Sequence, residues 1–278
     1  MYHYFFVHTF FIFNLRHRRN PCVFFVLVFR SDCMYLLKVS HLSMEVSGRT
    51  LFTDVSLEIK ENERIALIGE NGIGKTTLIR GLLGLKPVSS AQVSFNIEKE
   101  QIGYMVQEAE SNIELPLKQW VVYNHPIAQL KTELDKYTEL LNESANSNIT
   151  AKYNHTLQKF LDVEGYEWEF EVERLLKQIG LESNLWEVPF SNLSGGQKTR
   201  AKLVRMMLKQ PKLIILDEPT NHLDIDTIQW LENWLNEFNG AVLFISHERE
   251  FIDNVATAVY ELTVNGTKKY NGGYSSYK

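Results

Sequence analysis

The chain has 278 residues, of which 44% are hydrophobic and 23% are charged, which is ordinary for a soluble globular protein. That length allows one large domain or a core with an attached subdomain. The formal net charge of −5 argues against a strongly basic binder of DNA or other nucleic acid. Both cysteines, Cys22 and Cys33, lie in the first 33 residues, so the rest of the chain has neither a disulfide scaffold nor a cysteine zinc site. The scarcity of cysteines favours a reducing, cytoplasmic location.

Residues 1–33 differ from the rest of the chain and are interpreted as a leader outside the domain. An apolar, aromatic run is followed by a basic cluster at residues 16–19 and by a second apolar run. Neither run reaches the roughly 18 to 20 residues that a helix needs to span a bilayer. The order of charged and apolar parts is also unlike that of a signal peptide. The leader is therefore either a membrane-surface anchor or sequence upstream of a natural start at Met34, and we favour the second because the domain pattern begins there.

From Met34 onward the pattern predicts strands. Alternating or apolar runs at residues 34–39 and 54–59 indicate two of them, and Gly48 marks a turn between the two. A third apolar run at residues 65–68 reads as a buried strand, and residues 78–83 read as a helix. Between these last two lies a glycine-rich stretch.

Strand, glycine-rich loop, lysine, hydroxyl and helix together form the pattern of a phosphate-binding loop. Glycines let the backbone wrap around an anion, and the helix start adds unpaired N–H groups and a partial positive charge. Lys75 is expected to contact the β- and γ-phosphates of a nucleotide, and Thr76 to offer its hydroxyl to Mg²⁺. The nucleotide-binding stretch comprises Gly69, Glu70, Asn71, Gly72, Ile73, Gly74, Lys75, Thr76 and Thr77.

Residues 108–192 predict a helical subdomain. Polar, turn-rich residues 142–150 indicate the tip of a helical hairpin, and apolar residues from Tyr153 to Leu161 indicate its returning helix. Residues 166–172 alternate with the period of a strand, but we interpret them as helix because helical spacing continues beyond them. Gly180 then supplies a C-cap. The first helix of the hairpin is indicated by the apolar stripe Ile127, Leu130, Leu134, Tyr137 and Leu141.

Three more apolar runs, alternating with helical patterns, predict an α/β core with a largely parallel sheet. Helices are expected over residues 198–210 and from about residue 227 to 238. Each run ends in polar residues: residues 102–106 before Gln107, residues 213–216 before Asp217 and Glu218, and residues 241–245 before His247.

Because ligands of such sheets bind at the carboxyl ends of the strands, these polar residues are expected to meet beside the phosphate loop. In isolation the acidic pair could be a solvated turn, and the histidine a structural one. Beside a phosphate loop, Asp217 is expected to hold Mg²⁺ and Glu218 to activate the attacking water. His247 is expected to contact the γ-phosphate.

At residues 193–197, Leu-Ser-Gly-Gly-Gln, the sequence resembles the signature of the ATP-binding cassette superfamily. The resemblance covers residues 34–278 in the motif order of that superfamily. It implies a cassette core at residues 34–107 and 193–278, with an N-terminal antiparallel β part and an inserted helical subdomain at 108–192. It also implies that Gln107 is the Q-loop glutamine, a catalytic residue and Mg²⁺ ligand, that Asp224 belongs to the D-loop, and that His247 is the switch histidine.

The same resemblance implies an ATPase that uses ATP and Mg²⁺ and works in pairs. The signature lies at a predicted helix N-terminus, where Ser194, Gly195, Gly196 and Gln197 would grip the nucleotide of a second cassette. That cassette can belong to the same or to another polypeptide.

Residues 218–224 and 246–253 look like the ABC-F branch of soluble, translation-associated ATPases, and residues 270–277 are similar to the close of their first cassette. This implies the N-terminal cassette of a protein that acts on the ribosome, either in translation or in resistance to ribosome-targeting antibiotics. The sequence departs from the branch in its leader, in ending before a linker and second cassette, and in having Glu45 and Val46 where an aromatic residue usually stacks on adenine. We therefore expect the N-terminal half of a longer protein or a truncated form.

Two alternatives stay open. One is an ATPase subunit of a membrane transporter, which would dock a transporter subunit instead of the ribosome. The other is a binding module that holds ATP without hydrolysing it.

Overall fold

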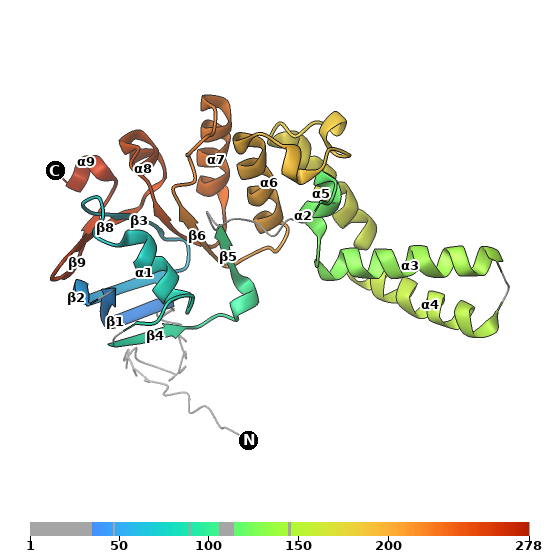
Figure 1. Cartoon of the computed structure of the whole chain (residues 1–278), viewed down its shortest axis with the longest axis horizontal. Coiled ribbons are helices and arrows are strands. Elements are labelled where there is room, and N and C mark those ends of the chain that lie inside the picture. Colours follow the sequence, from blue (N-terminus) through green and yellow to red (C-terminus); the bar gives the residue numbers. More distant parts are fainter. Residues whose placement is uncertain (1–34, 47, 89, 106–113, 144–145, 278) are drawn as a thin grey trace, which may run out of the picture. The chain divides into compact units, whose positions relative to one another are not determined.

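The computed structural model describes residues 35–46, 48–88, 90–105, 114–143 and 146–277, which belong to one compact unit (Figure 1). The leader and Gln107 lie outside the described residues.

The central sheet contains six strands in the order β5-β6-β7-β3-β8-β9. Neighbouring strands run parallel, except that β9 pairs with β8 in the antiparallel sense. This confirms the predicted α/β class with a mainly parallel sheet. In chain order the strands are β3 (Arg64–Ile68), β5 (Ile102–Met105), β6 (Leu213–Asp217), β7 (Ala241–Ile245), β8 (Ala258–Thr263) and β9 (Gly266–Asn271).

The central strands of this sheet are buried on both faces, which explains their continuous apolar runs. In β6, Leu213 and Ile215 belong to one hydrophobic core. Ile214 and Leu216, which alternate with them, belong to the core on the opposite face. β3 and β7 divide their side chains in the same way. Because no polar face remains, these strands were recognisable from apolar runs alone.

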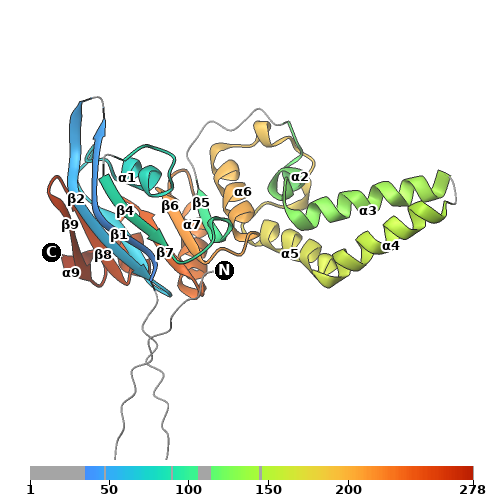
Figure 2. The same ribbon diagram turned by 90° about the horizontal axis from the view of Figure 1, so that it is seen from below.

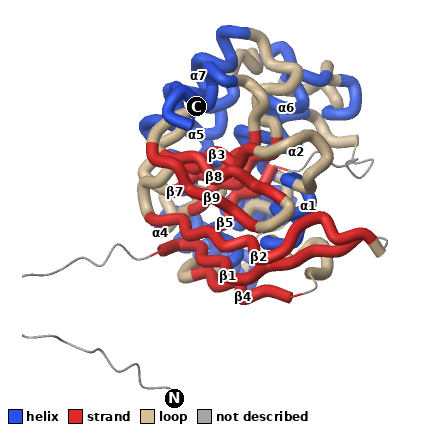
Figure 3. The backbone as a smooth tube through the Cα atoms, turned by 90° about the vertical axis from the view of Figure 1, so that its left-hand side faces the viewer, coloured by secondary structure: helices blue, strands red, loops and turns tan. Residues whose placement is uncertain are grey.

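A second, antiparallel sheet has three strands in the order β2-β1-β4, and Figure 3 shows the two groups of strands as separate layers. Its strands are β1 (Tyr35–Val46), β2 (Arg49–Lys60) and β4 (Ser90–Phe95). The two strands predicted at residues 34–39 and 54–59 correspond to β1 and β2, and both are longer than predicted. Their pairing continues past a register shift, beside which His41 Nδ1 lies 2.6 Å from Asp54 Oδ1. Helix α1 (Lys75–Leu82) shares its buried core with both sheets through Leu78 and Ile79.

The other face of the central sheet is covered by helices from the second half of the chain and from the helical subdomain (Figure 1). They bury the core that holds Ile214 and Leu216. The helices are α2 (Leu117–Val122), α5 (Gly165–Gln178), α6 (Gly195–Met207), α7 (Ile225–Glu237) and α8 (Arg249–Val255), followed by the short α9 (Tyr274–Tyr277). Single 3-10 turns occur at Lys99–Gln101, Ser183–Leu185 and Phe190–Asn192.

Helices α3 (Pro126–Glu143) and α4 (Ser147–Asp162) form the predicted helical hairpin, here called the arm (Figures 1 and 2). Its tip is shorter than the predicted residues 142–150, because the side chain of Asn146 accepts a hydrogen bond from the Asn148 N–H and starts α4 early. Leu161, one of the apolar residues that indicated the returning helix, is 47% exposed. Residues 166–172 are helical, which confirms that interpretation.

The base of the arm is attached to the rest of the fold through His125, just before α3. Its ring stacks on Trp168 of α5, with centroids 4.5 Å apart. Its Nε2 donates to the Leu208 carbonyl at 3.2 Å, while its Nδ1 accepts from the Ile127 N–H at 3.3 Å. This pair of hydrogen bonds requires the neutral ring, with the proton on Nε2.

Acid pH is expected to weaken this attachment. Burial lowers the pKa of His125, the hydrogen bond to Leu208 opposes that effect, and the charge of Lys209 lowers the pKa further. With a folded-state pKa below the unfolded one, the stabilising contribution of His125 is present above the unfolded pKa of about 6.5 and is lost as pH falls through the folded value.

Urea unfolding at neutral and mildly acidic pH, followed by circular dichroism, measures this contribution. We expect His125→Phe to lose less stability on acidification than the unsubstituted chain. His155→Phe, at an exposed site on the arm, is the matched control and should keep the original pH dependence. Identical pH profiles for His125→Phe and the original chain would contradict the assignment.

Candidate nucleotide site

The glycine-rich loop joins β3 to α1 through backbone geometry that requires glycine at two positions. A Cβ on Gly69 would lie 2.6 Å from the Leu262 carbonyl oxygen, which is too close for any side chain. Gly74 is the N-cap of α1 and has φ of 106°, a conformation that side-chain-bearing residues rarely adopt. The loop therefore wraps tightly and presents the N-terminus of α1 at its centre.

Lys75 begins α1, and its side chain folds back over the loop. Its Nζ donates to the Gly69 carbonyl at 2.9 Å and to the Glu70 carbonyl at 3.2 Å. Only 8% of the residue is exposed, and this burial lowers the pKa of Lys75, while the nearby carboxylates Glu218 and Asp217 oppose the effect. The ammonium group is thus held in the concave side of the loop, where it can bind phosphate oxygens.

Thr76 and Asp217 form the second part of the site. The Thr76 hydroxyl donates to Asp217 Oδ1 at 3.2 Å, so the helix start after β3 meets the carboxyl end of β6. Burial raises the pKa of Asp217, and the Thr76 hydroxyl and the charges of Arg80 and Lys75 act in the opposite direction. A hydroxyl beside a buried carboxylate is a pair of hard oxygen donors.

This donor set fits Mg²⁺ that arrives with a nucleotide. Mg²⁺ in such sites takes one or two protein carboxylates and completes its shell with phosphates and water. Within the described residues, no group of three or more histidines, cysteines or acidic residues could hold a metal ion. With one hydroxyl and one carboxylate, the Thr76–Asp217 pair suits a cation whose remaining ligands are phosphate and water.

Glu218 and His247 lie together at the ends of adjacent strands β6 and β7. His247 Nε2 is 3.1 Å from Glu218 Oε1, and the Glu218 N–H donates to the Ile245 carbonyl at 3.0 Å. Glu218 adopts a φ of 50°, which is uncommon for a residue with a side chain and marks a site under local constraint. Burial raises the pKa of Glu218, and the neighbouring His247 opposes this shift. A carboxylate tuned toward neutral pH is suited to accept a proton.

The structure thus brings together the loop, Asp217, Glu218 and His247 from strands β3, β6 and β7, which are neighbours in the sheet. Gln107 lies outside the described residues, and its assignment stays a prediction. The strand before it, β5, is paired with β6 up to Met105 and Leu216.

The signature residues form the start of α6. The Ser194 hydroxyl accepts from the Gln197 N–H at 3.3 Å, and the Gln197 side chain accepts from the Ser194 N–H at 3.0 Å, a complete capping box. Ser194 and Gly195 are exposed. Their backbone is therefore organised by local hydrogen bonds and remains accessible to a partner.

Asp224, which the resemblance assigns to the D-loop, caps α7. It accepts hydrogen bonds from the Thr227 N–H at 2.9 Å and from the Thr227 hydroxyl at 2.8 Å, and these bonds lower the pKa of Asp224. Its other oxygen lies 3.6 Å from Nη1 of Arg200 on α6. The D-loop and the signature helix are consequently joined by an ion pair and by the close approach of Gly196 to the His222 carbonyl.

Three positioning residues were missed from the sequence. Arg200 pairs with Asp224, Arg80 acts electrostatically on Asp217, and the Ser246 hydroxyl accepts from the Glu248 N–H at 3.1 Å beside His247. Arg80 follows Thr76 by one helical turn, and this spacing could have predicted that Arg80 lies near the expected Mg²⁺ ligands. Arg200 is linked to Asp224 only by the tertiary fold.

A methyl group on Gly196 is expected to separate the signature helix from the D-loop. Its Cβ would lie 2.6 Å from the His222 carbonyl oxygen, whereas a Cβ on Gly195 meets nothing within 4 Å. We expect Gly196→Ala to lower the free energy of unfolding by about 1 to 3 kcal/mol through overpacking. Gly195→Ala is the matched control and should change the free energy of unfolding by no more than about 1 kcal/mol. Urea denaturation measures both, and equal effects would refute the proposed contact.

The chain belongs to the ATP-binding cassette superfamily, because the family model described as "ABC transporter" matches residues 52–221. Within it, the chain is an ATPase cassette of the ABC-F type.

Three relatives illustrate this assignment. The chain is 36% identical over 250 residues to the putative ATP-binding protein YdiF of Bacillus subtilis, covering 88% of this chain and 38% of that protein. It is 32% identical to the ATP-binding protein Uup of Escherichia coli, over 88% of this chain and 38% of that protein. It is 31% identical to the energy-dependent translational throttle protein EttA of Escherichia coli, over 82% of this chain and 41% of that protein. The chain therefore spans about two fifths of the length of these relatives.

Solved structures share the fold. The ATP-binding subunit of an ABC transporter superposes with a TM-score of 0.63 at 22% identity, covering 85% of this chain and 90% of that one. The transporter component cbiO1 from Clostridium perfringens gives a TM-score of 0.58 at 23% identity, over 85% of this chain and 88% of that one. In the part of the chain that the structure describes, no helix combines the length and apolar character of a membrane span.

Proposed function

We propose that this chain binds ATP with Mg²⁺ and hydrolyses it, as the cassette of an ABC-F protein that acts on the ribosome in the cytoplasm. The observation that carries the hydrolytic part is the pairing of Glu218 with His247 beside the Thr76–Asp217 pair. A proton-accepting carboxylate then lies next to a site fitted for phosphate and Mg²⁺.

Each residue has a separate role in this proposal. Thr76 and Asp217 hold Mg²⁺, together with Gln107, while Lys75 and the loop amides bind the phosphates. Bound Mg²⁺ supplies charge neutralisation to the phosphates. Glu218 orients water and accepts its proton, and His247, 3.1 Å away, steadies that carboxylate.

A second cassette completes the site. The signature residues Ser194 and Gly195 are exposed at the start of α6, and the Ser194 hydroxyl bonds within the capping box, to the Gln197 N–H. A helix N-terminus of this kind is suited to bind an anion, here the γ-phosphate held by a partner cassette. The exposed Ile225, which follows Asp224, adds an apolar contact beside it.

The ribosomal part of the proposal is supported by the relative whose name describes translational control, EttA, and by the arm inserted between β5 and the signature. Sedimentation through a sucrose cushion tests it. We expect the chain to pellet with purified ribosomes in the presence of ATP, and a larger fraction of the Glu218→Gln variant to pellet than of the original chain. Without ribosomes, the chain should stay in the supernatant. Pelleting with membrane vesicles but not with ribosomes would instead support a transporter subunit.

Resistance to a ribosome-targeting antibiotic is a narrower form of the same proposal. It predicts that expression of the complete protein raises the inhibitory concentration of such a drug, and that Glu218→Gln removes the effect. The transporter alternative draws on fold likeness to transporter subunits at 22 to 23% identity. It also draws on the description of the matching family and on the name of a Bacillus subtilis relative, the uncharacterized ABC transporter ATP-binding protein YfmR, at 34% identity. None of these findings distinguishes the branches.

A further inference from the structure

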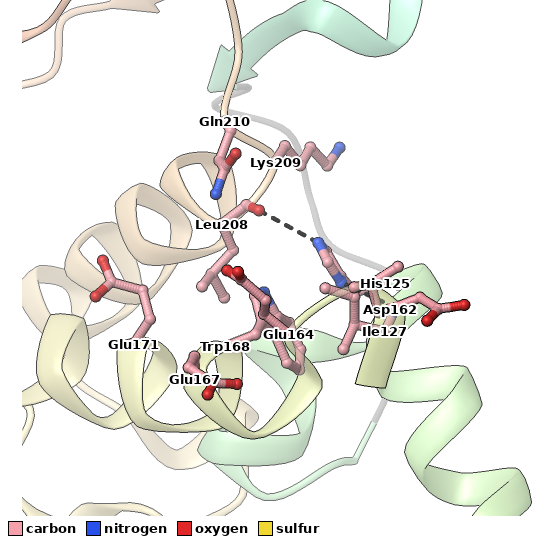
Figure 4. Close-up of a pocket in the computed structure, with 11 residues that line it drawn as sticks. His125, Ile127, Asp162, Glu164, Glu167, Trp168, Glu171, Leu208, Lys209 and Gln210 are labelled. Atoms are coloured by element: carbon pink, nitrogen blue, oxygen red, sulfur yellow. Dashed lines mark hydrogen bonds between the residues drawn. The ribbon is translucent and has the colours of Figure 1, made fainter. Parts of the chain in front are cut away.

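A cleft of about 620 Å³ lies at the base of the arm and shares no lining residue with the nucleotide site (Figure 4). Its walls come from the start of α3, from the elbow between α4 and α5 with the first turns of α5, and from the end of α6. The arm and the cassette core therefore both contribute to it.

The cleft is strongly acidic. Four carboxylates line it, those of Asp162, Glu164, Glu167 and Glu171, against one ammonium group, that of Lys209. Glu167 and Glu171 lie four residues apart on α5, and Glu164 is the residue just before that helix (Figure 4). The C-terminal end of α6 adds the partial negative charge of its last carbonyls. The N-terminus of α5 offsets part of this negative charge, but the lining side chains still carry a net negative charge that attracts a cation.

Two of these carboxylates are available for a partner. Glu171 already forms hydrogen bonds of 2.7 and 2.6 Å with the guanidinium of Arg174, and Asp162 accepts one of 2.8 Å from Gln158. In contrast, Glu164 and Glu167 make no side-chain hydrogen bond or ion pair with any residue in the described part of the chain. The carboxylates of Glu164 and Glu167 can therefore pair with an incoming cation without breaking an existing side-chain contact.

The floor of the cleft is apolar and aromatic. Trp168 lies in it, stacked against the neutral ring of His125, and Val163 and Leu208 add aliphatic surface. A planar guanidinium can stack on an aromatic ring while its N–H groups reach carboxylates, and its aliphatic stem can cover apolar surface. The mixture of acidic rim and aromatic floor therefore fits arginine better than a simple metal cation.

We propose that this cleft binds an arginine side chain on a basic segment of a partner protein. Glu164 and Glu167 pair with the guanidinium, and Trp168 supports it from below. The acidic rim would repel the phosphates of RNA, so charge complementarity selects protein over nucleic acid. The site uses none of the residues of the nucleotide site, so it goes beyond the proposed function and does not depend on it.

Fluorescence anisotropy with a short labelled peptide, in which arginine alternates with glycine, tests this site on the full chain. At about 150 mM salt, where long-range attraction is screened, Glu164→Gln/Glu167→Gln should weaken binding about fivefold. The matched control Glu139→Gln/Glu143→Gln removes the same charge from exposed positions on α3 and should leave binding unchanged. A peptide with glutamine in place of arginine should not bind.

A second pair of variants should act in the opposite direction. Lys209→Glu replaces the opposing charge in the cleft and should tighten peptide binding about threefold. Lys212 is exposed and lies outside the cleft, so Lys212→Glu should leave peptide binding unchanged. Each of three results would overturn the proposal. The first is that the double glutamine variant in the cleft and the double glutamine variant on α3 weaken peptide binding equally. The others are that Lys209→Glu has no effect, or that oligouridylate RNA displaces the peptide. ATP hydrolysis, measured in the same preparations, should be unchanged by any of these substitutions.

Discussion

Replacing Lys75 with alanine is expected to weaken ATP binding at least about a hundredfold, to below detection. The ammonium group is the cation held inside the loop by the Gly69 and Glu70 carbonyls, and charge-assisted bonds to phosphate are about twice as strong as neutral ones. Without it, the loop keeps its amides but loses the charge that neutralises the β- and γ-phosphates. Equilibrium titration with a labelled ATP analogue measures the change.

The same substitution should leave the empty protein folded. Removing the lysine relieves its desolvation cost but also removes its hydrogen bonds to the Gly69 and Glu70 carbonyls, so we expect the urea midpoint to change little. Lys86→Ala, on the chain just beyond α1, is the control for a general loss of charge. Nucleotide affinity within about threefold of the original would contradict the role of Lys75 as a phosphate ligand.

The sequence contained enough information for the central strands and for most of the site. β3, β6 and β7 are buried on both faces, so each appears as an unbroken apolar run, and the polar residues that follow are brought together by a parallel sheet. The arm was also predictable, because its apolar spacing is helical. In these segments, local pattern and tertiary environment agree.

The remaining parts depend on tertiary contacts that leave little local trace. Strand β9, at the edge of the sheet, has the polar sequence Gly-Thr-Lys-Lys-Tyr-Asn and pairs through its backbone with β8. The pairing of Arg200 with Asp224 joins α6 to the start of α7, although β6 separates the two in sequence. The His125–Trp168 stack likewise joins the residue before α3 to α5. Such contacts are determined by packing rather than by periodicity.

Replacing Glu218 with glutamine is expected to reduce ATP turnover by about 10² to 10⁴-fold while ATP still binds. Glutamine keeps the size of the side chain and its backbone position at the end of β6, but it cannot accept a proton from water. The phosphate-binding loop is unchanged, so affinity should remain within about threefold. Phosphate release and nucleotide titration measure the two quantities on the same sample. Glu248→Gln, exposed next to His247, is the matched control.

The variant also tests whether the nucleotide joins two cassettes. If hydrolysis is what separates them, blocking proton transfer should trap the ATP-bound pair, and sedimentation velocity should show a dimer that appears with Glu218→Gln and ATP but not with ADP. Adding Ser194→Arg should abolish that dimer, because a bulky cation at the exposed start of α6 blocks close approach, while ATP affinity of the single chain persists. A Glu218→Gln chain with unchanged turnover would exclude this carboxylate as the base. A chain that stays monomeric with ATP would exclude a site shared between two copies and leave a cassette on another polypeptide as its partner.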